Sequence, residues 1–420
     1  MALSVVVPVY QNPYALRHTL SSLAAQSLPA EQFEVIVVDD CSPEPVAGLV
    51  AQFADVLPVR WVRHPVNRGR AAARNTGAST ATEDHLLFLD ADSVAHPELL
   101  ARHVAWHADG HERVVLGRRV ESDWRTAARF ADPGTLPDVV PCHQDDARMG
   151  FGVETEGTVD SSPWVFLVSH NFSLPRRTFV DIGGFDEVFD RWGWEDTELA
   201  YRLYLHWERA HGRFVYAPTA TCYHVPHYSD FGRNWDNARS GLEYLVRKHE
   251  HYEVERLGEY PRDQVLNLPT YAAFLERAVD ASAQLAPELE RSLPAAGRRL
   301  WAGRGARLLR HRPTATLDVT SERTETNKPL LGLKTPWPDG SFDDVVHWEN
   351  WRVLTVTDLG GLIRESLRLA GALYLAGTVA PTGEHPLACP ADVLGALQTS
   401  PFVVRQIAVT DSLWAIEVRP

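Results

Sequence analysis

Cysteine is scarce in this sequence, and acidic residues outnumber basic ones. The four cysteines among 420 residues lie far apart and form no Cys-x-x-Cys pair. This spacing indicates neither a zinc site nor a disulfide framework, and we expect a reduced, cytoplasmic setting. Lysine and arginine number 41 against 55 acidic residues, a formal net charge of -14. A chain this acidic is a poor partner for nucleic acid or for an anionic membrane surface.

Long apolar runs and repeats are also missing, and we expect no leader segment. No stretch approaches the length of apolar sequence that a membrane-spanning helix needs, so we expect no such helix. The first residues run directly into Val5-Val6-Val7 without a basic region or a cleavage site, which predicts no signal peptide. What remains is a chain long enough for two or three globular domains, and 45% of its residues are hydrophobic.

Strand and helix signals alternate at the start of the chain, over residues 1–110. Four short, nearly continuous apolar runs predict strands, and leucines at helical spacing follow the first of them. Such strands, separated by helices, predict an α/β fold with a parallel sheet covered on both faces. Ligands of these sheets bind beyond the carboxyl ends of the strands. The apolar runs cover residues 3–9, 35–38, 59–62 and 86–89.

The character of the sequence changes along the chain, which predicts three parts. Residues 1–232 carry the strand and helix alternation, residues 233–300 are typical of a helical extension, and residues 301–420 predict a small α/β module. A basic, glycine-containing stretch at 298–313 is typical of a linker. The oligomeric state stays open, a homo-oligomer included.

The sharpest chemical signal is Asp90-Ala91-Asp92, directly after the last of the four predicted strands. Two carboxylates this close at a strand end can bind one divalent cation such as Mg²⁺ or Mn²⁺. The ion would neutralise a departing diphosphate as a Lewis acid. Alternatively, the strand ends in a solvated acidic turn, because the pattern is short.

Four features follow one another along the chain, and this acidic pair is the last of them. They are the strand ending at Pro8-Val9-Tyr10, the strand ending at Asp39-Asp40, the segment 67–77 with its basic start, and the acidic pair itself. In this combination residues 3–230 resemble the family 2 glycosyltransferases, which have the GT-A nucleotide-diphospho-sugar transferase fold. The resemblance implies a metal-dependent, inverting transfer of a hexose or N-acetylhexosamine from a nucleotide-sugar donor. The acceptor would be a hydroxyl group of a glycan, polysaccharide or small molecule.

The resemblance implies donor-side roles for the residues that match the family pattern. Pro8 and Tyr10 would line the base pocket, and Asp40 would accept a hydrogen bond from the imide N–H of the base, which favours uracil. Further residues would lie near the base or the diphosphate, or pair with surface acids as the alternative. They are Asn67, Arg70, Arg74 and Asp90.

The resemblance also implies a metal site and a catalytic base. His224 would be the third metal ligand beside Asp90 and Asp92, with His227 as the competing candidate, and mixed oxygen and imidazole ligands favour Mn²⁺ over Mg²⁺. Asp196, at the start of a predicted helix, would deprotonate the acceptor hydroxyl. Glu195 would bind acceptor hydroxyls. Alternatively, Asp196 only caps the helix and the histidine is structural.

Aromatic residues beside these acids predict an acceptor platform. Trp192 and Trp194 flank Gly193 and would offer ring faces to a sugar. The family resemblance implies that Asn171 lies near the donor sugar and the acceptor. The alternatives are core packing for the tryptophans and a strand-end turn for Asn171. We expect the loop-rich residues 120–165 to complete the acceptor pocket.

The C-terminal part resembles the middle of a class I methyltransferase over residues 336–378. A glycine-rich turn of the kind such enzymes use is matched only by Gly303-Arg304-Gly305, and no convincing strand precedes it. We therefore expect a degenerate module that serves acceptor recognition or dimerisation. The alternatives are an unrelated small α/β domain and a bifunctional enzyme that also methylates.

Two other functions fit parts of the pattern less well. A nucleotidyltransferase would need a glycine-rich, lysine-containing loop after the first strand, and residues 8–12 do not supply it. A non-catalytic subunit that binds nucleotide sugars would not need the acids at 90, 92, 195 and 196.

Overall fold

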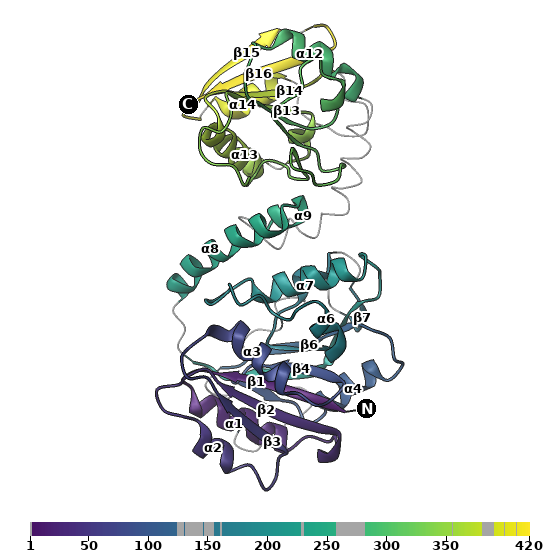
Figure 1. Cartoon of the computed structure of the whole chain (residues 1–420), viewed down its shortest axis with the longest axis vertical. Coiled ribbons are helices and arrows are strands. Elements are labelled where there is room, and N and C mark those ends of the chain that lie inside the picture. Colours follow the sequence, from purple (N-terminus) through teal and green to yellow (C-terminus); the bar gives the residue numbers. More distant parts are fainter. Residues whose placement is uncertain are drawn as a thin grey trace. The chain divides into compact units, whose positions relative to one another are not determined.

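The computed structural model describes residues 2–123, 130, 146, 155–159, 162–227, 231–257, 282–354, 356–379, 390–398, 400–408 and 410–420. The chain forms two compact units, Met1–Gly241 and Leu242–Pro420 (Figure 1). Each unit contains a sheet and covering helices, so the α/β fold class predicted from the sequence is confirmed. The predicted three-part division stays a prediction. Most of the expected acceptor loop at 120–165 lies outside the described residues.

One twisted sheet organises the first unit. Its parallel half follows the predicted apolar runs in the order β3-β2-β1-β4, and the rest continues with β8, β6, β9 and β5. β8 is antiparallel to both β4 and β6, β9 is parallel to β6, and β5 and β7 are antiparallel to β9. The strands are β1 (Leu3–Val9), β2 (Phe33–Asp39), β3 (Val59–Arg63), β4 (His85–Leu89), β5 (Ser93–Ala95), β6 (Val114–Glu121), β7 (Gly157–Thr158), β8 (Asn171–Pro175) and β9 (Phe214–His224).

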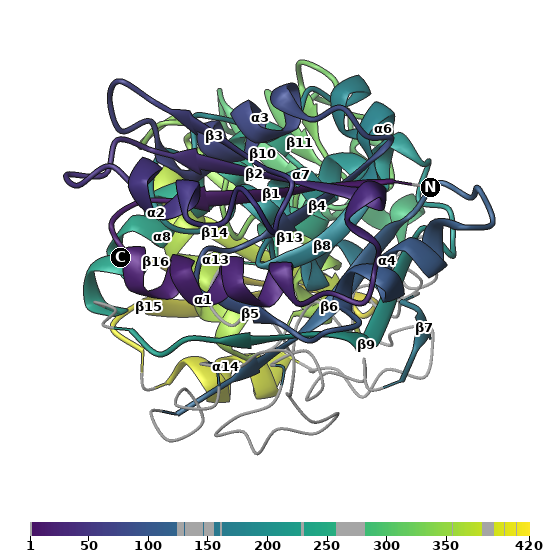
Figure 2. The ribbon, with the colours of Figure 1, turned by 90° about the horizontal axis from the view of Figure 1, so that it is seen from below.

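Helices cover both faces of this sheet, which explains why its strands are apolar on both sides. Alternate residues of β1 share a core cluster with Leu16 and Leu20 of α1, while Val6 on the opposite face meets Gly77 of α3. A Cβ at Gly77 would lie 2.2 Å from Val6 Cγ1, so the missing side chain permits this approach. Figure 2 shows α1 and α3 on opposite faces. The helices are α1 (Pro13–Ala24), η1 (Ala30–Gln32), α2 (Ala47–Ala51), α3 (Gly69–Thr80), α4 (Leu99–His107), η5 (Pro163–Phe166), α6 (Arg176–Asp181) and α7 (Glu195–His206).

The strand register brings distant polar residues to one edge of the sheet. β1 and β2 are parallel with Val9 opposite Asp39, so their carboxyl ends meet. The end of β9 lies between two strands, because His224 pairs with Ser93 of β5 and with Glu121 of β6. These pairings set His224 beside the turn that follows β4.

In the described part of the second unit, seven strands form one sheet in the order β12-β11-β10-β13-β14-β16-β15. The strands β10 to β14 are parallel to their neighbours among one another, whereas β16 is antiparallel to both of its neighbours, β14 and β15. Separate core clusters lie on the two faces, one with α13 and α14 and the other with α12. The strands are β10 (Arg299–Ala302), β11 (Ala315–Leu317), β12 (Asn327–Lys328), β13 (Asp344–Trp348), β14 (Leu373–Thr378), β15 (Val403–Ala408) and β16 (Leu413–Arg419).

The remaining helices join or cover the second sheet. They are α8 (Phe231–His249), which contains the unit boundary, α9 (Tyr252–Glu255), η6 (Ala283–Leu285), α12 (Ala286–Ser292), η7 (Ala306–Leu308), η8 (Asn350–Val353), α13 (Val356–Leu369) and α14 (Pro390–Leu397). Across the described segments, no helix combines the length and apolar character needed to cross a membrane.

The linker predicted at 298–313 is wrong. β10 occupies the start of that stretch and is an inner strand of the second sheet, paired with β11 and β13. Its three buried residues, Leu300, Trp301 and Ala302, are too short a run to stand out beside the surrounding arginines. A strand therefore does precede Gly303, contrary to the sequence-based expectation.

Candidate active site

A carboxylate and two imidazoles converge after β4. Asp92 follows the strand, His224 ends β9 and His227 lies three residues further on, and one ligand atom from each lies within 4.8 Å of the others. His227 Nε2 is 2.9 Å from Asp92 Oδ2, and His224 Nε2 is 3.4 Å from the same oxygen. The structure thus brings together two of the three predicted metal ligands and adds the competing histidine.

The surroundings of this cluster fix the ring of His224. Glu121 Oε2 lies 2.7 Å from His224 Nδ1, which leaves Nε2 directed at Asp92. Burial alone would lower the pKa of His224, but the hydrogen bonds to Asp92 and Glu121 raise it to about 9. Burial alone would raise the pKa of Asp92, yet the hydrogen bonds from the two histidines hold it below its usual range.

The cluster has the donor set that a divalent ion requires. Asp92 Oδ1 is buried, and no hydrogen-bond donor reaches it within the described part of the chain. A buried carboxylate oxygen without a partner is costly unless something else binds it. Oxygen and imidazole ligands together suit Mn²⁺ and related transition-metal ions. Asp92, His224 and His227 therefore fit such an ion.

Arg74 joins the two groups of acids that the sequence placed more than a hundred residues apart. Its Nη2 lies 2.9 Å from Asp90 Oδ1 and its Nη1 lies 3.1 Å from Glu195 Oε1. Arg74 and Glu195 are buried. Burial opposes the charge of Arg74, but Asp90, Glu195 and Asp196 raise its pKa above the usual value. Asp90 thus faces the arginine, and its predicted role as a metal ligand stays a prediction, with His227 as a further candidate beside Asp92 and His224.

Asp196 lies next to this bridge at the start of α7. Its Oδ2 accepts from Ser169 N at 3.3 Å and its Oδ1 from Thr197 N at 2.8 Å. Burial, followed by the neighbouring charge of Glu195, raises the pKa of Asp196 to about 6. The N-cap residue of α7 is Trp194, so Asp196 already belongs to the first turn. A carboxylate with this pKa is suited to general base catalysis near neutral pH.

Asp40 anchors the loop that leads into α3. Its Oδ1 accepts from His64 Nδ1 at 2.7 Å and from Arg68 N at 2.9 Å, and its Oδ2 accepts from Gly69 N at 2.8 Å. The side chain is buried, so its structural task is to hold the start of α3, the helix that carries Arg74. The predicted contact of Asp40 with a base stays a prediction.

Comparison with known proteins assigns this unit to a family. The family model "Glycosyl transferase family 2" matches residues 4–149, and "N-terminal domain of galactosyltransferase" matches residues 162–228. The chain carries a family 2 glycosyltransferase domain. The family resemblance expected from the sequence is thus confirmed, whereas the methyltransferase resemblance of the second unit stays a prediction.

Several relatives of this family 2 domain are glycosyltransferases. Validoxylamine A glucosyltransferase of Streptomyces hygroscopicus subsp. jinggangensis is 34% identical over 219 residues, 49% of this chain and 51% of the relative. Hyaluronan synthase of Pasteurella multocida is 26% identical over 67% of this chain and 31% of its own length. A crystal structure of S. aureus TarS 1-349 has 19% identity, covers 70% of this chain and 77% of that chain, and has a TM-score of 0.46. The chain spans about half the length, or less, of these two curated relatives.

The other predicted donor residues of the family 2 domain lie around the same strand ends. Tyr10 is exposed just after β1, and Pro8 is half-buried in it. Asn67 is exposed and donates to the Asp40 carbonyl oxygen. Arg70 is exposed, with its Nε 3.8 Å from Glu195 Oε1. Their contacts with a donor stay predictions.

The predicted acceptor residues differ in what they contact. Asn171 is fully buried, its Nδ2 donates to the carbonyl oxygens of Arg118 and Ala220, and its Oδ1 lies 2.9 Å from His103 Nε2. Asn171 therefore fixes the junction of β6, β8 and β9, and the predicted acceptor contact is corrected to a structural role. Trp194 is half-buried and donates from Nε1 to the Ala238 carbonyl oxygen in α8.

The two tryptophans of the family 2 domain differ in how far their rings are packed. The indole of Trp194 packs at α8, with Cδ1 near Gly241, which favours the packing alternative. Trp192 is 37% exposed and has the freer ring. A platform role stays a prediction for both rings.

Sequence reasoning missed residues that support this site. Glu121 and the neighbouring Arg119 come from β6. Burial opposes the charge of the half-buried Arg119, but the charges of Asp92 and Glu121 raise its pKa. Asn75 of α3 holds the backbone of Phe185 by two hydrogen bonds. Its Oδ1 accepts from Phe185 N at 2.8 Å, and its Nδ2 donates to the Phe185 carbonyl oxygen at 2.9 Å. The sequence predicts no strand over residues 114–121, so no local signal identifies the first pair.

Arg74→Ala tests the bridge. It leaves Asp90 and the buried Glu195 without their shared cation, so we expect the free energy of unfolding to fall by roughly 3–5 kcal/mol. Urea denaturation followed by circular dichroism measures the change. The matched control is Arg70→Ala, an exposed arginine near the same glutamate, with an expected change within about 0.5 kcal/mol. Equal effects of the two variants would contradict a special role for Arg74.

Proposed function

We propose that the first unit catalyses metal-dependent transfer of a hexosyl or N-acetylhexosaminyl group from a nucleotide-diphosphate sugar, UDP-linked by preference, to a hydroxyl acceptor with inversion. The family assignment and the glucosyltransferase among the relatives support hexosyl transfer. Tyr10 and the basic loop before α3, at the carboxyl ends of parallel strands, support nucleotide binding there.

The observation that carries the proposal is the Arg74 bridge. One buried guanidinium bonds both Asp90, after β4, and Glu195, at the start of α7. An inverting transfer needs a leaving-group site and an acceptor base close together, and both sets of acids converge on this residue. The remaining Glu195 oxygen, Oε2, is buried and has no hydrogen-bond partner among the described residues, as an acceptor hydroxyl would require.

In this proposal the chain's residues divide the work between the two ends of the reacting bond. Asp196 accepts the proton of the acceptor hydroxyl, whose oxygen bonds to the anomeric carbon from the face opposite the diphosphate. The bond from that carbon to the diphosphate breaks, and the nucleoside diphosphate leaves with the electron pair. A divalent ion held by Asp92, His224 and His227 would act as a Lewis acid on the leaving group.

Asp196→Asn tests the assignment of the base. The amide keeps the shape but cannot accept a proton, so we expect transfer to fall about 10²–10⁴-fold while UDP affinity is unchanged. UDP release from a panel of UDP-sugars and hydroxyl acceptors measures transfer, and calorimetry measures binding. Asp190→Asn, an exposed aspartate before α7, is the matched control. Undiminished transfer by Asp196→Asn would support a non-catalytic binding subunit instead.

The pH profile gives the same test a second readout. The pKa of Asp196 is raised to about 6, so the carboxylate form that accepts a proton is lost as pH falls through that value. We expect kcat/KM for transfer to decline on the acid side near pH 6. A profile that stays flat down to pH 4.5 would contradict Asp196 as the base.

Glu121→Ala tests the metal site without relying on activity. Ligand histidines are commonly oriented by a carboxylate on their other nitrogen, and loss of that partner costs about 10–100-fold in metal affinity. We expect Mn²⁺ to bind Glu121→Ala more weakly by that factor, as measured by electron paramagnetic resonance titration. Glu31→Ala, an exposed glutamate in η1, should bind Mn²⁺ as the parent does. Unchanged affinity in Glu121→Ala would contradict the site.

A further inference from the structure

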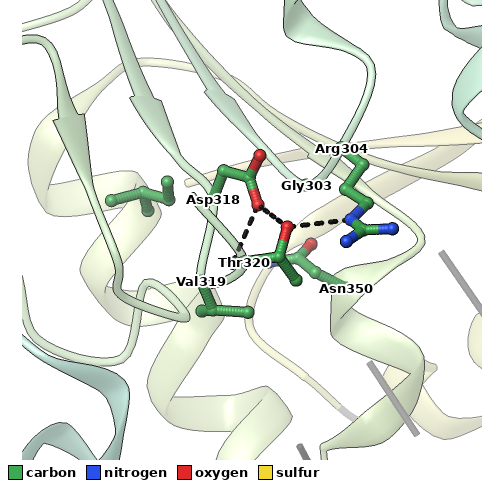
Figure 3. Close-up of a pocket in the computed structure, with 7 residues that line it drawn as sticks. Gly303, Arg304, Asp318, Val319, Thr320 and Asn350 are labelled. Carbon is green, nitrogen blue, oxygen red and sulfur yellow. Dashed lines mark hydrogen bonds between the residues drawn. The ribbon is translucent and has the colours of Figure 1, made fainter. Parts of the chain in front are cut away.

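A pocket of the second unit is lined by polar groups that already have partners. Figure 3 shows Asp318, Thr320 and Arg304 joined by hydrogen bonds, and Asn350 Nδ2 donates to the Leu331 carbonyl oxygen. The first unit contains a set of buried polar side chains that differs in this respect. It ends in a nitrogen that no group in the described part of the chain satisfies.

This set joins α4 to β8. It consists of His103 and His107 of α4 and of Asn171 and Ser173 of β8, and we call it the histidine network. His103 Nε2 lies 2.9 Å from Asn171 Oδ1, and His103 Nδ1 lies 2.8 Å from Ser173 Oγ. His107 Nε2 lies 2.8 Å from the same hydroxyl oxygen. All four side chains are buried, so these bonds hold α4 on β8 away from solvent.

The hydrogen bonds of Asn171 fix the direction of the whole network. Its Nδ2 donates to two carbonyl oxygens, so its Oδ1 accepts the proton of His103 Nε2. A neutral imidazole carries one proton, so His103 Nδ1 accepts from the Ser173 hydroxyl, and that oxygen accepts in turn from His107 Nε2. His107 Nδ1 is therefore unprotonated, and it is buried with no hydrogen-bond partner among the described residues.

The groups around this nitrogen oppose a proton there. The His85 ring of β4 lies against the His107 ring, with 4.5 Å between the centroids, and within the described segments its buried Nδ1 also has no hydrogen-bond partner. Burial lowers the pKa of His107 to about 2, and His85, His103 and Arg113 lower it as well, against the opposing charge of Asp109.

The other two histidines are shifted in the same direction. Burial lowers the pKa of His103 to about 4, although the hydrogen bond to Asn171 opposes the shift. Burial also lowers the pKa of His85, which the charge of Asp84 opposes and the positive amino terminus supports. The closed structure therefore keeps all three rings neutral.

Three neutral, buried histidines make the closed structure sensitive to acid. In an opened segment a histidine takes up a proton near pH 6.5. The pKa values in the closed structure are lower, so their stabilising contribution is complete above about pH 6.5 and is lost as pH falls toward about 4. A proton on His103 Nδ1 would break its bond from Ser173, and a proton on His107 Nδ1 would stay without an acceptor.

The other end of the network holds the strands of the metal-ligand candidates. Asn171 donates to the Arg118 carbonyl oxygen of β6 and to the Ala220 carbonyl oxygen of β9. Glu121 follows the first of these on β6, and His224 follows the second at the end of β9. The packing of α4 and the junction of β6, β8 and β9 are thus linked through one set of hydrogen bonds.

We propose that the histidine network is an acid-sensitive latch, which holds α4 on the sheet at neutral pH and releases it when the histidines take up protons below about pH 6.5. The release opens the junction of β6, β8 and β9 and leaves β1 and β2 in place. The latch consists of residues outside the proposed catalytic groups, so it does not depend on the transfer reaction or on a bound ion.

Hydrogen exchange of the full chain at pH 7 and pH 5, followed by mass spectrometry, tests the latch. Protection factors, taken relative to the intrinsic exchange rate at each pH, report the opening of each segment. Protonation of one opened histidine favours opening by about 25-fold over this interval. We therefore expect the protection factors of α4 to fall by at least about 25-fold, and those of β1 and β2 by less than about threefold.

Two variants remove one titrating ring each. His107→Phe keeps a ring of similar shape without a nitrogen, so the fall in α4 protection should be about 25-fold smaller than in the parent. His103→Gln can still make both hydrogen bonds of the network, and it should reduce the fall by a similar factor. The matched control is His111→Phe, an exposed histidine just after α4, which should behave as the parent does. Circular dichroism at pH 7 checks that each variant folds.

The outcomes separate the latch from general acid unfolding. Equal falls in the parent and in both variants of the network would overturn the proposal, and so would α4 protection that does not change between the two pH values. A uniform loss over α4, β1 and β2 would show unfolding of the whole unit, which also overturns it. The measurement involves no donor or ion, so none of these outcomes affects the proposed glycosyl transfer or the role of Asp196.

Discussion

A single buried guanidinium holds the candidate active site together. Arg74 is surrounded by Asp90, Glu195 and Asp196, and a buried cation of this kind is tolerated only because the acids compensate its lost hydration. The acids in turn could not share one site without it. The geometry of the strand ends and of α7 thus depends on one arginine in the second turn of α3.

Other contacts maintain the position of that arginine. Asp40 binds the backbone at the start of α3, and Asn75 binds the backbone N–H and carbonyl oxygen of Phe185 in the loop that leads to α7. The ring of Phe185 lies under the Arg74 guanidinium, 5.3 Å from Cζ to the ring centroid. Asp40, which was predicted to contact the base, and Asn75, for which no role was predicted, therefore both place α3 against α7.

Local sequence signals were sufficient for one half of this fold. The apolar runs of β1, β2 and β4 set the parallel strands, and the polar residues directly after them, Tyr10, Asp40 and Asp90, lie where the runs end. Glu121 could not be found in this way. It reaches His224 only through the β6–β9 pairing across 103 residues, and the periodicity of neither strand records that pairing.

The errors have related physical causes. The family resemblance implied a ligand contact for Asn171, yet at the junction of three strands its buried amide donates to two backbone carbonyl oxygens that would otherwise lack a partner there. Asp90 and Asp92 look equivalent in sequence, but their carboxylates face different neighbours, Arg74 for Asp90 and the histidines of β9 and its extension for Asp92, and the metal contact of Asp90 stays a prediction. β10 was overlooked because its burial comes from strands added later in the chain.

The central claim is that the acids joined by Arg74 and the cluster at Asp92 form one site for a nucleotide-sugar. A crystal structure of the chain soaked with UDP and Mn²⁺, with the ion located by anomalous scattering, tests it most directly. We expect the ion on Asp92 and at least one of the two histidines, with the diphosphate between it and Arg70 and the uracil ring against Tyr10. An ion or a nucleotide bound away from these residues would contradict the account.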